Sequence, residues 1–417
     1  MNLYRLELKR VCKTRMTAIL LAIALVLAVV MAYLPVTFIG WTELDASGNK
    51  VSYTGLKAIR KRQEQQVSGT ITPDVMQEAL EAYQRVYRQH DASSINDIPV
   101  EVFYKELARY QPLVNNAKEA FADPKTGMAP GVMGLTAEDM QNFYSQLPKR
   151  LESVIWLEQS GKPGYEQAQA IAQKKFDAVQ KPFTYSFGVS SDAMDYQTLL
   201  SLLLTLLCAV IAAPVFASDA QTGAQDIQLC TKNGGLRLAA AKLAAAFSIT
   251  GAAYLLCGVV WILVTNALFG WESTQTSVQW LFSVTSLLPY TVGQMEWVML
   301  VANFLIFFAE VAFVLMASVW AKNNLTALSV ALISVVAPLI VYMVVPGSFG
   351  EWLSTLIPAG GIGLSNALLY KMIGFDFLYA GRHAFFQADV LLASAPVKIV
   401  LLVGLAAWGY LRKTKVA

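Results

Sequence analysis

Six long apolar runs dominate the sequence. Each run reaches or approaches the roughly 20 residues that a helix needs to cross a bilayer. Only 15% of all residues are charged and 55% are hydrophobic, whereas about a quarter of the residues in soluble proteins are charged. The sequence therefore predicts an all-α membrane protein with six transmembrane helices, near Thr17–Ile39, Leu199–Ala217, Leu243–Phe269, Trp297–Trp320, Leu325–Val345 and Val390–Leu411.

Lysine and arginine residues flank these runs unevenly. They precede the first run, separate the second from the third, follow the fourth and follow the sixth. An even number of spans brings all these segments to one side of the membrane, and the positive-inside rule assigns that side to the cytoplasm. We therefore expect both termini in the cytoplasm, on the evidence of Arg5, Lys9, Arg10, Lys13, Arg15, Lys232, Arg237, Lys242, Lys322, Arg412, Lys413 and Lys415.

Residues 1–40 are expected to form an amphipathic N-terminal helix on the membrane surface, followed by the first span. Leu3, Leu6 and Leu8 alternate there with basic residues, which is typical of a helix in the membrane interface. The alternative is a basic flank that only sets orientation. The first apolar run is too long for a signal-peptide core and no A-x-A site follows it, so we interpret it as an uncleaved span.

Residues 41–195 are polar and are expected to form a helical extracytoplasmic domain between spans 1 and 2. Thr72 and Pro73 have the positions of a helix cap and a first helical residue. Thr136 and Asp139 resemble a capping box before a second helix, and residues 164–180 read as a third. The tyrosine-rich helix faces of this domain are either a ligand surface or ordinary core, and core is the commoner case.

The sequence lacks the motifs that several classes of enzyme and binding protein require. The sequence contains no GxxxxGK[ST], HExxH or GxSxG motif, so nucleotide, zinc-protease and serine-hydrolase chemistry are not expected. The four cysteines do not have metal-ligand or CxxC spacing. The net charge of +3 is too small to indicate nucleic-acid binding. We therefore expect no enzymatic activity, no metal and no cofactor in this chain.

A short polar segment separates the second and third apolar runs. Ser218 or Asp219 is a candidate helix N-cap, and residues 233–235, Asn-Gly-Gly, could supply the left-handed conformation that ends a helix. Ala220, Ala224 and Ile227 would form a narrow apolar stripe between them. Residues 219–233 are therefore predicted to be a short amphipathic helix suited to docking in a groove of a partner.

This segment resembles the coupling-helix region of ABC-2 type permeases, the membrane subunits of ABC exporters. Thr231, Lys232, Gly234 or Gly235, Arg237 and Lys242-Leu243 loosely follow a pattern of such permeases, although Leu236 replaces a basic residue. The six-span layout and the large domain after the first span are also similar. The residues that the resemblance assigns to coupling are Asp219, Ala220, Gly223, Ala224, Ile227, Leu229, Lys232 and Arg237.

The resemblance implies a bacterial plasma-membrane protein that works with partners. A separate ABC ATPase subunit would bind ATP and Mg²⁺, and a second permease chain would complete a homo- or heterodimer among membrane lipids. The exported substrate would be amphipathic, such as a peptide, a drug or a lipid. The alternative is a non-transporting receptor whose outer domain binds a ligand.

Two features of spans 2–6 (residues 196–417) bear on such a pathway. Residues 346–394, interrupted by Pro358-Ala359-Gly360-Gly361, are expected to form either a re-entrant segment or a pair of outer surface helices. Glu310 and Lys398 are predicted at similar depth, roughly 18 and 21 Å from the inner boundary at 1.5 Å per residue. They would form an intramembrane pair with Asn303 nearby, or Lys398 would reach outward while Glu310 is protonated or hydrogen-bonded within the bundle.

Overall fold

The computed structural model describes residues 3–45, 49–364 and 366–414, which form a mostly helical protein. Six helices within these ranges are long and apolar enough to cross a membrane, and they coincide with the six predicted runs. The prediction of a multi-pass membrane protein with six candidate spans is therefore confirmed. The spans are α2 (Arg15–Thr37), α10 (Ser191–Ala212) continued by α11 (Pro214–Thr222), α13 (Leu236–Phe269), α15 (Val292–Trp320), α16 (Asn324–Val344) and α19 (Gln387–Thr414).

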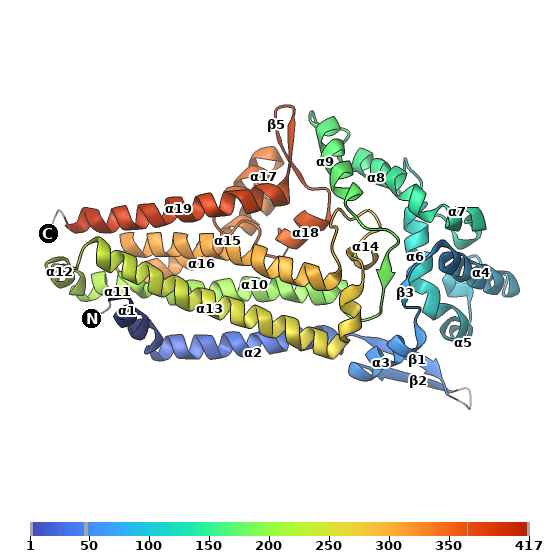
Figure 1. The fold of residues 1–417 in the computed structure, drawn as a ribbon, viewed down its shortest axis with the longest axis horizontal. Helices are drawn as coiled ribbons and strands as arrows, with labels where there is room; N and C mark the ends of the chain where they lie inside the picture. Colours follow the sequence, from blue (N-terminus) through green and yellow to red (C-terminus); the bar gives the residue numbers. More distant parts are fainter. Residues whose placement is uncertain (1–2, 46–48, 365, 415–417) are drawn as a thin grey trace.

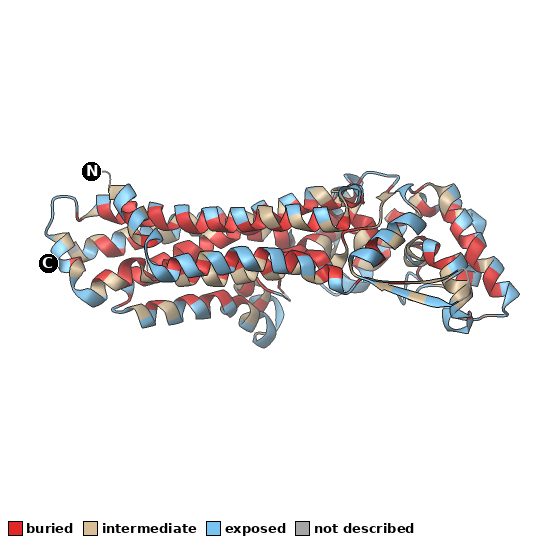
Figure 2. Ribbon diagram, turned by 90° about the horizontal axis from the view of Figure 1, so that it is seen from below, coloured by how far each residue is buried: buried red, intermediate tan, exposed pale blue. Residues whose placement is uncertain are grey.

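The six spans run side by side along the long axis of the molecule (Figure 1). Helix α15 is central, because it packs against α10, α13, α16 and α19. The other bundle helices bury one side and expose apolar residues on the other (Figure 2), for example Ile333, Ile340 and Met343 of α16. Such faces suit a hydrocarbon environment, since a helix that is apolar all round is not a surface helix of a soluble protein.

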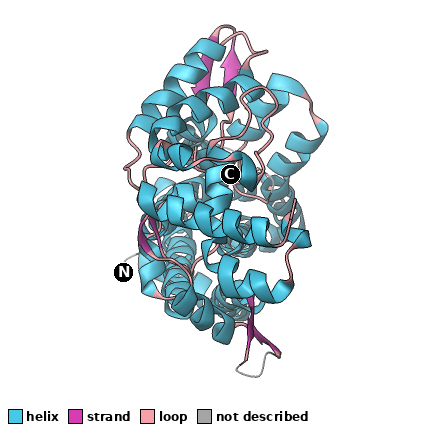
Figure 3. Ribbon diagram, turned by 90° about the vertical axis from the view of Figure 1, so that its right-hand side faces the viewer, coloured by secondary structure: helices cyan, strands magenta, loops and turns pink. Residues whose placement is uncertain are grey.

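We name the two ends of the bundle by what they carry. At the terminal end lie helix α1 (Leu3–Cys12), helix α12 (Ala224–Leu229) and the last turns of α19. At the domain end lies the insert domain, residues 40–190, which joins α2 to α10 (Figure 1). Viewed along the long axis from the domain end, helices cover most of this end, with short strands at two opposite edges (Figure 3).

The predicted helices of the insert domain are present. Thr72 accepts a hydrogen bond from the N–H of Val75 at the start of α4, and Thr136 and Asp139 form the expected capping box. Tyr83 is only 2% exposed, so the interpretation of the tyrosines as core is confirmed there. The helices are α3 (Leu56–Gln65), α4 (Pro73–Gln89), α5 (Val100–Val102), α6 (Gln111–Ala120), α7 (Ala137–Gln141), α8 (Phe143–Gln159) and α9 (Tyr165–Asp177).

The prediction of a purely helical fold was incomplete, because three short antiparallel strand pairs are present among the described residues. They are β1 (Gly40–Leu44) with β2 (Lys50–Thr54), β3 (Gly69–Thr70) with β4 (Thr184–Tyr185), and β5 (Phe377–Ala380) with β6 (His383–Phe386). Aromatic residues, which favour strands, are common in β5 and β6. Gly381 connects these strands with a φ of 61°, which glycine adopts without steric cost.

The chain between α16 and α19 folds back into the bundle. Helices α17 (Gly347–Leu356) and α18 (Leu368–Ile373) are joined by a turn in which Ala359 is fully buried. A Cβ atom on Gly361 would lie 3.0 Å from Ile306 of α15 and 3.3 Å from Leu391 of α19. This turn therefore packs against α15 and α19 inside the bundle, and the choice between a re-entrant segment and a pair of outer surface helices stays a prediction.

Two of the regions that hold the insert domain on the bundle lie between spans. The first is the connection between α13 and α15, which contains a turn at Trp271–Gln275 and α14 (Val278–Leu281), where the N–H of Thr184 donates to Ser277 Oγ at 3.0 Å. The second is the β5–β6 hairpin, where Tyr379 donates to Gln159 at 2.8 Å. These contacts hold the domain over the domain end of the spans.

Candidate functional site

A cluster of four charged side chains ties the terminal end together. Arg10 of α1 donates to both carboxylate oxygens of Asp219 at 2.9 and 3.0 Å and lies 3.0 Å from Glu7. Lys242 of α13 contacts Asp219 directly and lies 4.0 Å from Glu7. Lys242 is fully buried and Asp219 is 7% exposed. The two acids and two bases balance, so buried charges are compensated within the cluster.

The hydrogen-bond pattern of span 2 is interrupted just before this cluster. Pro214 begins α11 after a break at Ala213, because proline cannot donate the hydrogen bond that would continue α10. Ser318 of α15 binds backbone groups around this interruption: its Oγ accepts from the N–H groups of Phe216 and Ala217, each at 3.0 Å, and donates to the carbonyl of Ala213 at 2.6 Å. Ser318 therefore connects the end of span 2 to span 4.

The predicted amphipathic helix over residues 219–233 is not formed as one helix. Asp219 and Ala220 belong to α11, which continues span 2 to Thr222. Gly223 then adopts a φ of 71° and interrupts the helix before α12 begins at Ala224. Asp219 is not an N-cap, since its carboxylate binds Arg10 and Lys242. We call residues 219–235 the elbow.

The prediction that Asn-Gly-Gly at residues 233–235 supplies a left-handed helix stop was also wrong. Neither Gly234 nor Gly235 is among the glycines with positive φ, so the left-handed stop lies at Gly223 instead. Gly234 is required for another reason: a Cβ atom there would lie 1.7 Å from the carbonyl oxygen of Gln228. The chain passes too close to α12 at this point for any side chain.

The other residues predicted for coupling lie on the elbow or directly after it, with different exposure. Ile227 is 74% exposed, so the apolar stripe through Ala220, Ala224 and Ile227 is split between two helices and open at its tip. Lys232 is exposed, and Arg237, in the first turn of α13, donates to Asn233 at 3.3 Å. Leu229 lines a cavity of about 680 Å³ with Gln225, Asp226, Trp320, Gly409, Arg412 and Lys413.

Glu310 and Lys398 were predicted to pair within a chain or across a dimer. They form no direct ion pair within this chain, and a pair across a dimer stays a prediction. Glu310 is fully buried and accepts a hydrogen bond from Ser334 of α16. Lys398 donates to the carbonyls of Thr355 and Ile357, at 3.0 and 3.2 Å. These carbonyls end α17, and a helix C-terminus favours a cation. Lys398 therefore holds the buried turn, while Glu310 is bound within the bundle, as the alternative interpretation expected.

Asn303 lies on the same face of α15 as Glu310, seven residues earlier, and is 4% exposed. It lines a cavity of about 10 Å³, roughly the room for one water molecule. Gln197, Ser201 and Tyr254 supply the other polar atoms of this cavity. The structure thus places Asn303 at a small polar pocket inside the bundle, separate from Lys398.

A much larger cavity, of about 860 Å³, lies between the insert domain and the bundle. It is lined by α9, the loop at residues 287–290, β6 and the start of α19. Most lining side chains are apolar, such as Ile171, Leu288 and Phe385, and Lys174 and Lys175 stand among them. Lys175 pairs with Asp389 at 3.0 Å. The cavity could accommodate a molecule with an apolar body and a charged group.

Sequence reasoning missed parts of these sites. Arg10 was read only as a flanking positive charge and Glu7 was not considered, although an acid among basic residues in a short helix is a pairing signal. Glu296 lies just outside the predicted fourth span but inside α15, fully buried.

Comparisons of the sequence and structure with protein-family models, curated proteins and solved structures found no match.

Proposed function

We propose that this chain is the membrane permease subunit of an ATP-driven exporter of the ABC-2 type. A separate ABC ATPase subunit binds ATP and Mg²⁺, docks on the elbow and moves it during its cycle. The terminal end faces the cytoplasm of a bacterial cell, and the insert domain lies outside. A second permease chain completes the transporter.

The observation that carries this proposal is the construction of the elbow. Helix α12 projects at the terminal end of the bundle between spans 2 and 3 (Figure 1), and its Ile227 is exposed. The base of the elbow is rigidly joined to α1 and α13 through Asp219. A partner that displaces α12 therefore pulls on three elements of the bundle, which is what coupling requires.

The charge distribution supports the orientation. Arg5, Lys9, Lys13, Lys232 and Arg237 are all exposed at the terminal end, and an excess of basic residues is typical of the cytoplasmic side. Lys415, which the sequence adds to this set, lies outside the described residues.

The cavity beside the insert domain supports an amphipathic substrate. Its apolar lining suits the body of a lipid, drug or peptide, and Lys174 on its rim suits an anionic group. Exposed apolar faces on α16 and α19, which include Ile340 and Val400, are available for lipid or for a second permease chain.

The decisive experiment is capture of the partner. The tagged chain is crosslinked in membranes of its host and purified, and a P-loop ATPase is sought by mass spectrometry. Ile227→Asp places a charge on the exposed tip of the elbow and should abolish capture while leaving membrane insertion intact. Met128→Asp, at an equally exposed apolar residue of the insert domain, is the matched control and should capture normally.

The outcomes separate the two functions. Capture of a P-loop ATPase that is lost only in Ile227→Asp supports the exporter. Absence of any such ATPase from the wild-type complex would refute it and favour the receptor.

A further inference from the structure

Three polar side chains meet near the domain end of the bundle, each from a different span. Asn266 of α13 donates to the Glu296 carboxylate at 2.6 Å. Gln197 of α10 donates to the backbone carbonyl of Glu296 at 2.9 Å. Glu296 is fully buried, Asn266 is 1% exposed and Gln197 is 7% exposed. Asn266 therefore contacts the carboxylate of Glu296, Gln197 contacts the backbone of the same residue, and all three side chains are shielded from solvent.

Each of these side chains leaves one oxygen atom without a donor among the described residues. The atoms are Glu296 Oε1, Asn266 Oδ1 and Gln197 Oε1. The donors of both amides are already engaged, since Asn266 Nδ2 also donates to the carbonyl of Ile262 at 3.0 Å. A buried acceptor without a partner is costly, and oxygen atoms are the ligands that hard cations take.

The surroundings favour a cation over an anion or an apolar guest. Asn266 lies in the last turn of α13, and the carbonyl end of a helix carries partial negative charge. A single carboxylate matches one positive charge. No group of three or more His, Cys, Asp or Glu residues that could hold a metal was found among the described residues, so the divalent-ion arrangement of several carboxylates is not present here.

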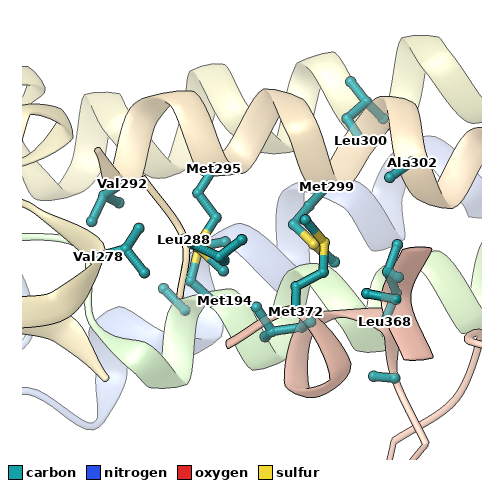
Figure 4. Packing of buried hydrophobic residues seen from close by; sticks show 14 of the residues in the cluster. Met194, Val278, Leu288, Val292, Met295, Met299, Leu300, Ala302, Leu368 and Met372 are labelled. Carbon is teal, nitrogen blue, oxygen red and sulfur yellow. The ribbon is translucent and has the colours of Figure 1, made fainter. Parts of the chain in front are cut away.

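Apolar side chains pack on the face of α15 next to Glu296. Figure 4 shows Met295 and Met299 of α15 directed toward Met194, Leu288 and Met372. Met295 and Met299 are spaced i, i+4 and share a helix face, and Glu296 follows on the adjacent face toward α10 and α13. An ion bound there would give up its water for protein oxygens.

Further buried polar side chains lie along α15 beyond the cluster. Gln197 also lines the cavity of about 10 Å³ that Asn303 faces. Glu296, Asn303 and Glu310 follow one another at seven-residue intervals along α15, and all three are buried. Seven residues correspond to nearly two helical turns, so these side chains lie on one stripe of the helix.

We propose that Glu296, Asn266 and Gln197 form a binding site for a single dehydrated monovalent metal cation of the Na⁺ or K⁺ class. The site is part of this chain alone and does not depend on an ATPase partner. Its failure would therefore leave the proposed exporter function untouched.

The test is direct binding of radioactive sodium to the purified full-length chain in detergent. We expect saturable binding of about one ion per chain, with competition by Na⁺, K⁺ or Li⁺ salts and none by choline chloride. The competition series identifies which of these ions the site prefers. Glu296→Gln should lower the affinity at least tenfold, because the charge and one ligand oxygen are lost. Glu272→Gln, at an exposed glutamate just beyond α13, is the control and should bind normally.

A second variant keeps the proposal falsifiable if Glu296→Gln does not fold. Gln197→Leu removes one ligand oxygen without a change of charge and should weaken binding severalfold, with an unchanged gel-filtration profile. The proposal is overturned if folded wild-type protein binds neither Na⁺ nor K⁺, which would leave Glu296 as a protonated carboxyl group. It is equally overturned if Glu296→Gln or Gln197→Leu binds sodium as well as wild type does.

Discussion

Replacement of Asp219 by asparagine tests the charge cluster of the terminal end. The substitution keeps the size of the side chain but removes the charge that Arg10 and Lys242 share. In the wild-type cluster, Glu7 and Asp219 balance Arg10 and Lys242. After the change, Glu7 alone faces two positive charges, and one of them, Lys242, is fully buried.

The magnitude follows from this imbalance. Removal of one partner from a buried ion pair costs about 3–5 kcal/mol. After the substitution, Lys242 still lies 4.0 Å from the Glu7 carboxylate. Two opposite charges at this distance attract each other by roughly 4 kcal/mol at an effective dielectric constant of about 20. Glu7 is already paired with Arg10, so it cannot compensate both bases in full. We therefore expect a loss near the lower part of the range, about 3 kcal/mol.

The assay is thermal unfolding in detergent, followed by tryptophan fluorescence. A loss of this size should lower the Tm by about 6–12 °C, from the usual scaling of roughly 2–4 °C per kcal/mol. The double variant Asp219→Asn, Lys242→Met restores neutrality and should recover most of the loss. The same change at the exposed Asp226 of α12 is the control and should have an effect within about 0.5 kcal/mol. A Tm of Asp219→Asn within a degree of wild type, or losses in the double variant that simply add, would refute the reasoning.

Three further predictions concern other parts of the chain. Tyr144 binds two backbone groups of the insert domain, so Tyr144→Phe should cost about 1–3 kcal/mol in denaturant unfolding. Burial raises the pKa of Tyr144 from 10.0 to about 12. Between these pH values the native state binds more protons than the unfolded state, so the free energy of unfolding should fall as the pH rises. Tyr144→Phe has no phenol to titrate at this position, so its free energy of unfolding should fall less. Lys398→Met should destabilise the buried turn after α17 by about 1–3 kcal/mol, whereas Lys398→Arg should retain much of the stability; equal Tm values for both would contradict its role. A cysteine at the exposed Ser68 should react with an impermeant thiol reagent in intact cells while the native Cys230 does not, and the opposite labelling would reverse the orientation.

Local signals in the sequence were sufficient for the spans and for several helix ends. Each span was identified because apolar length is a property of a continuous segment. The start of α4 at Pro73 and the capping box at Thr136 were identified because caps depend on residues only three positions apart. The β5–β6 hairpin was missed, although aromatic residues flank Gly381, because the apolar segment around it was read as part of a helical membrane region.

The candidate sites depended on contacts that no local pattern encodes. Asp219 was read as a cap because aspartate commonly caps helices, yet its partners lie on α1 and α13, far away in sequence. Lys398 and Glu310 were paired from their depth alone, but depth does not fix rotation about the helix axis. The structure directs Lys398 to the end of α17 and Glu310 to Ser334.

The sequence by itself determined a helical membrane protein with six candidate spans, a helical domain after the first span and a glycine-interrupted segment between spans 2 and 3. These features follow from hydrophobic length and from short-range capping, which act within one segment. Only the tertiary structure decided that Asp219 joins three helices, that Gly223 and not the Asn-Gly-Gly stretch provides the left-handed break, and that Glu296 meets Asn266 and Gln197. The physical reason is that a buried polar group is stabilised by whichever donor or charge the packing brings within hydrogen-bond distance, and packing is a property of the whole bundle.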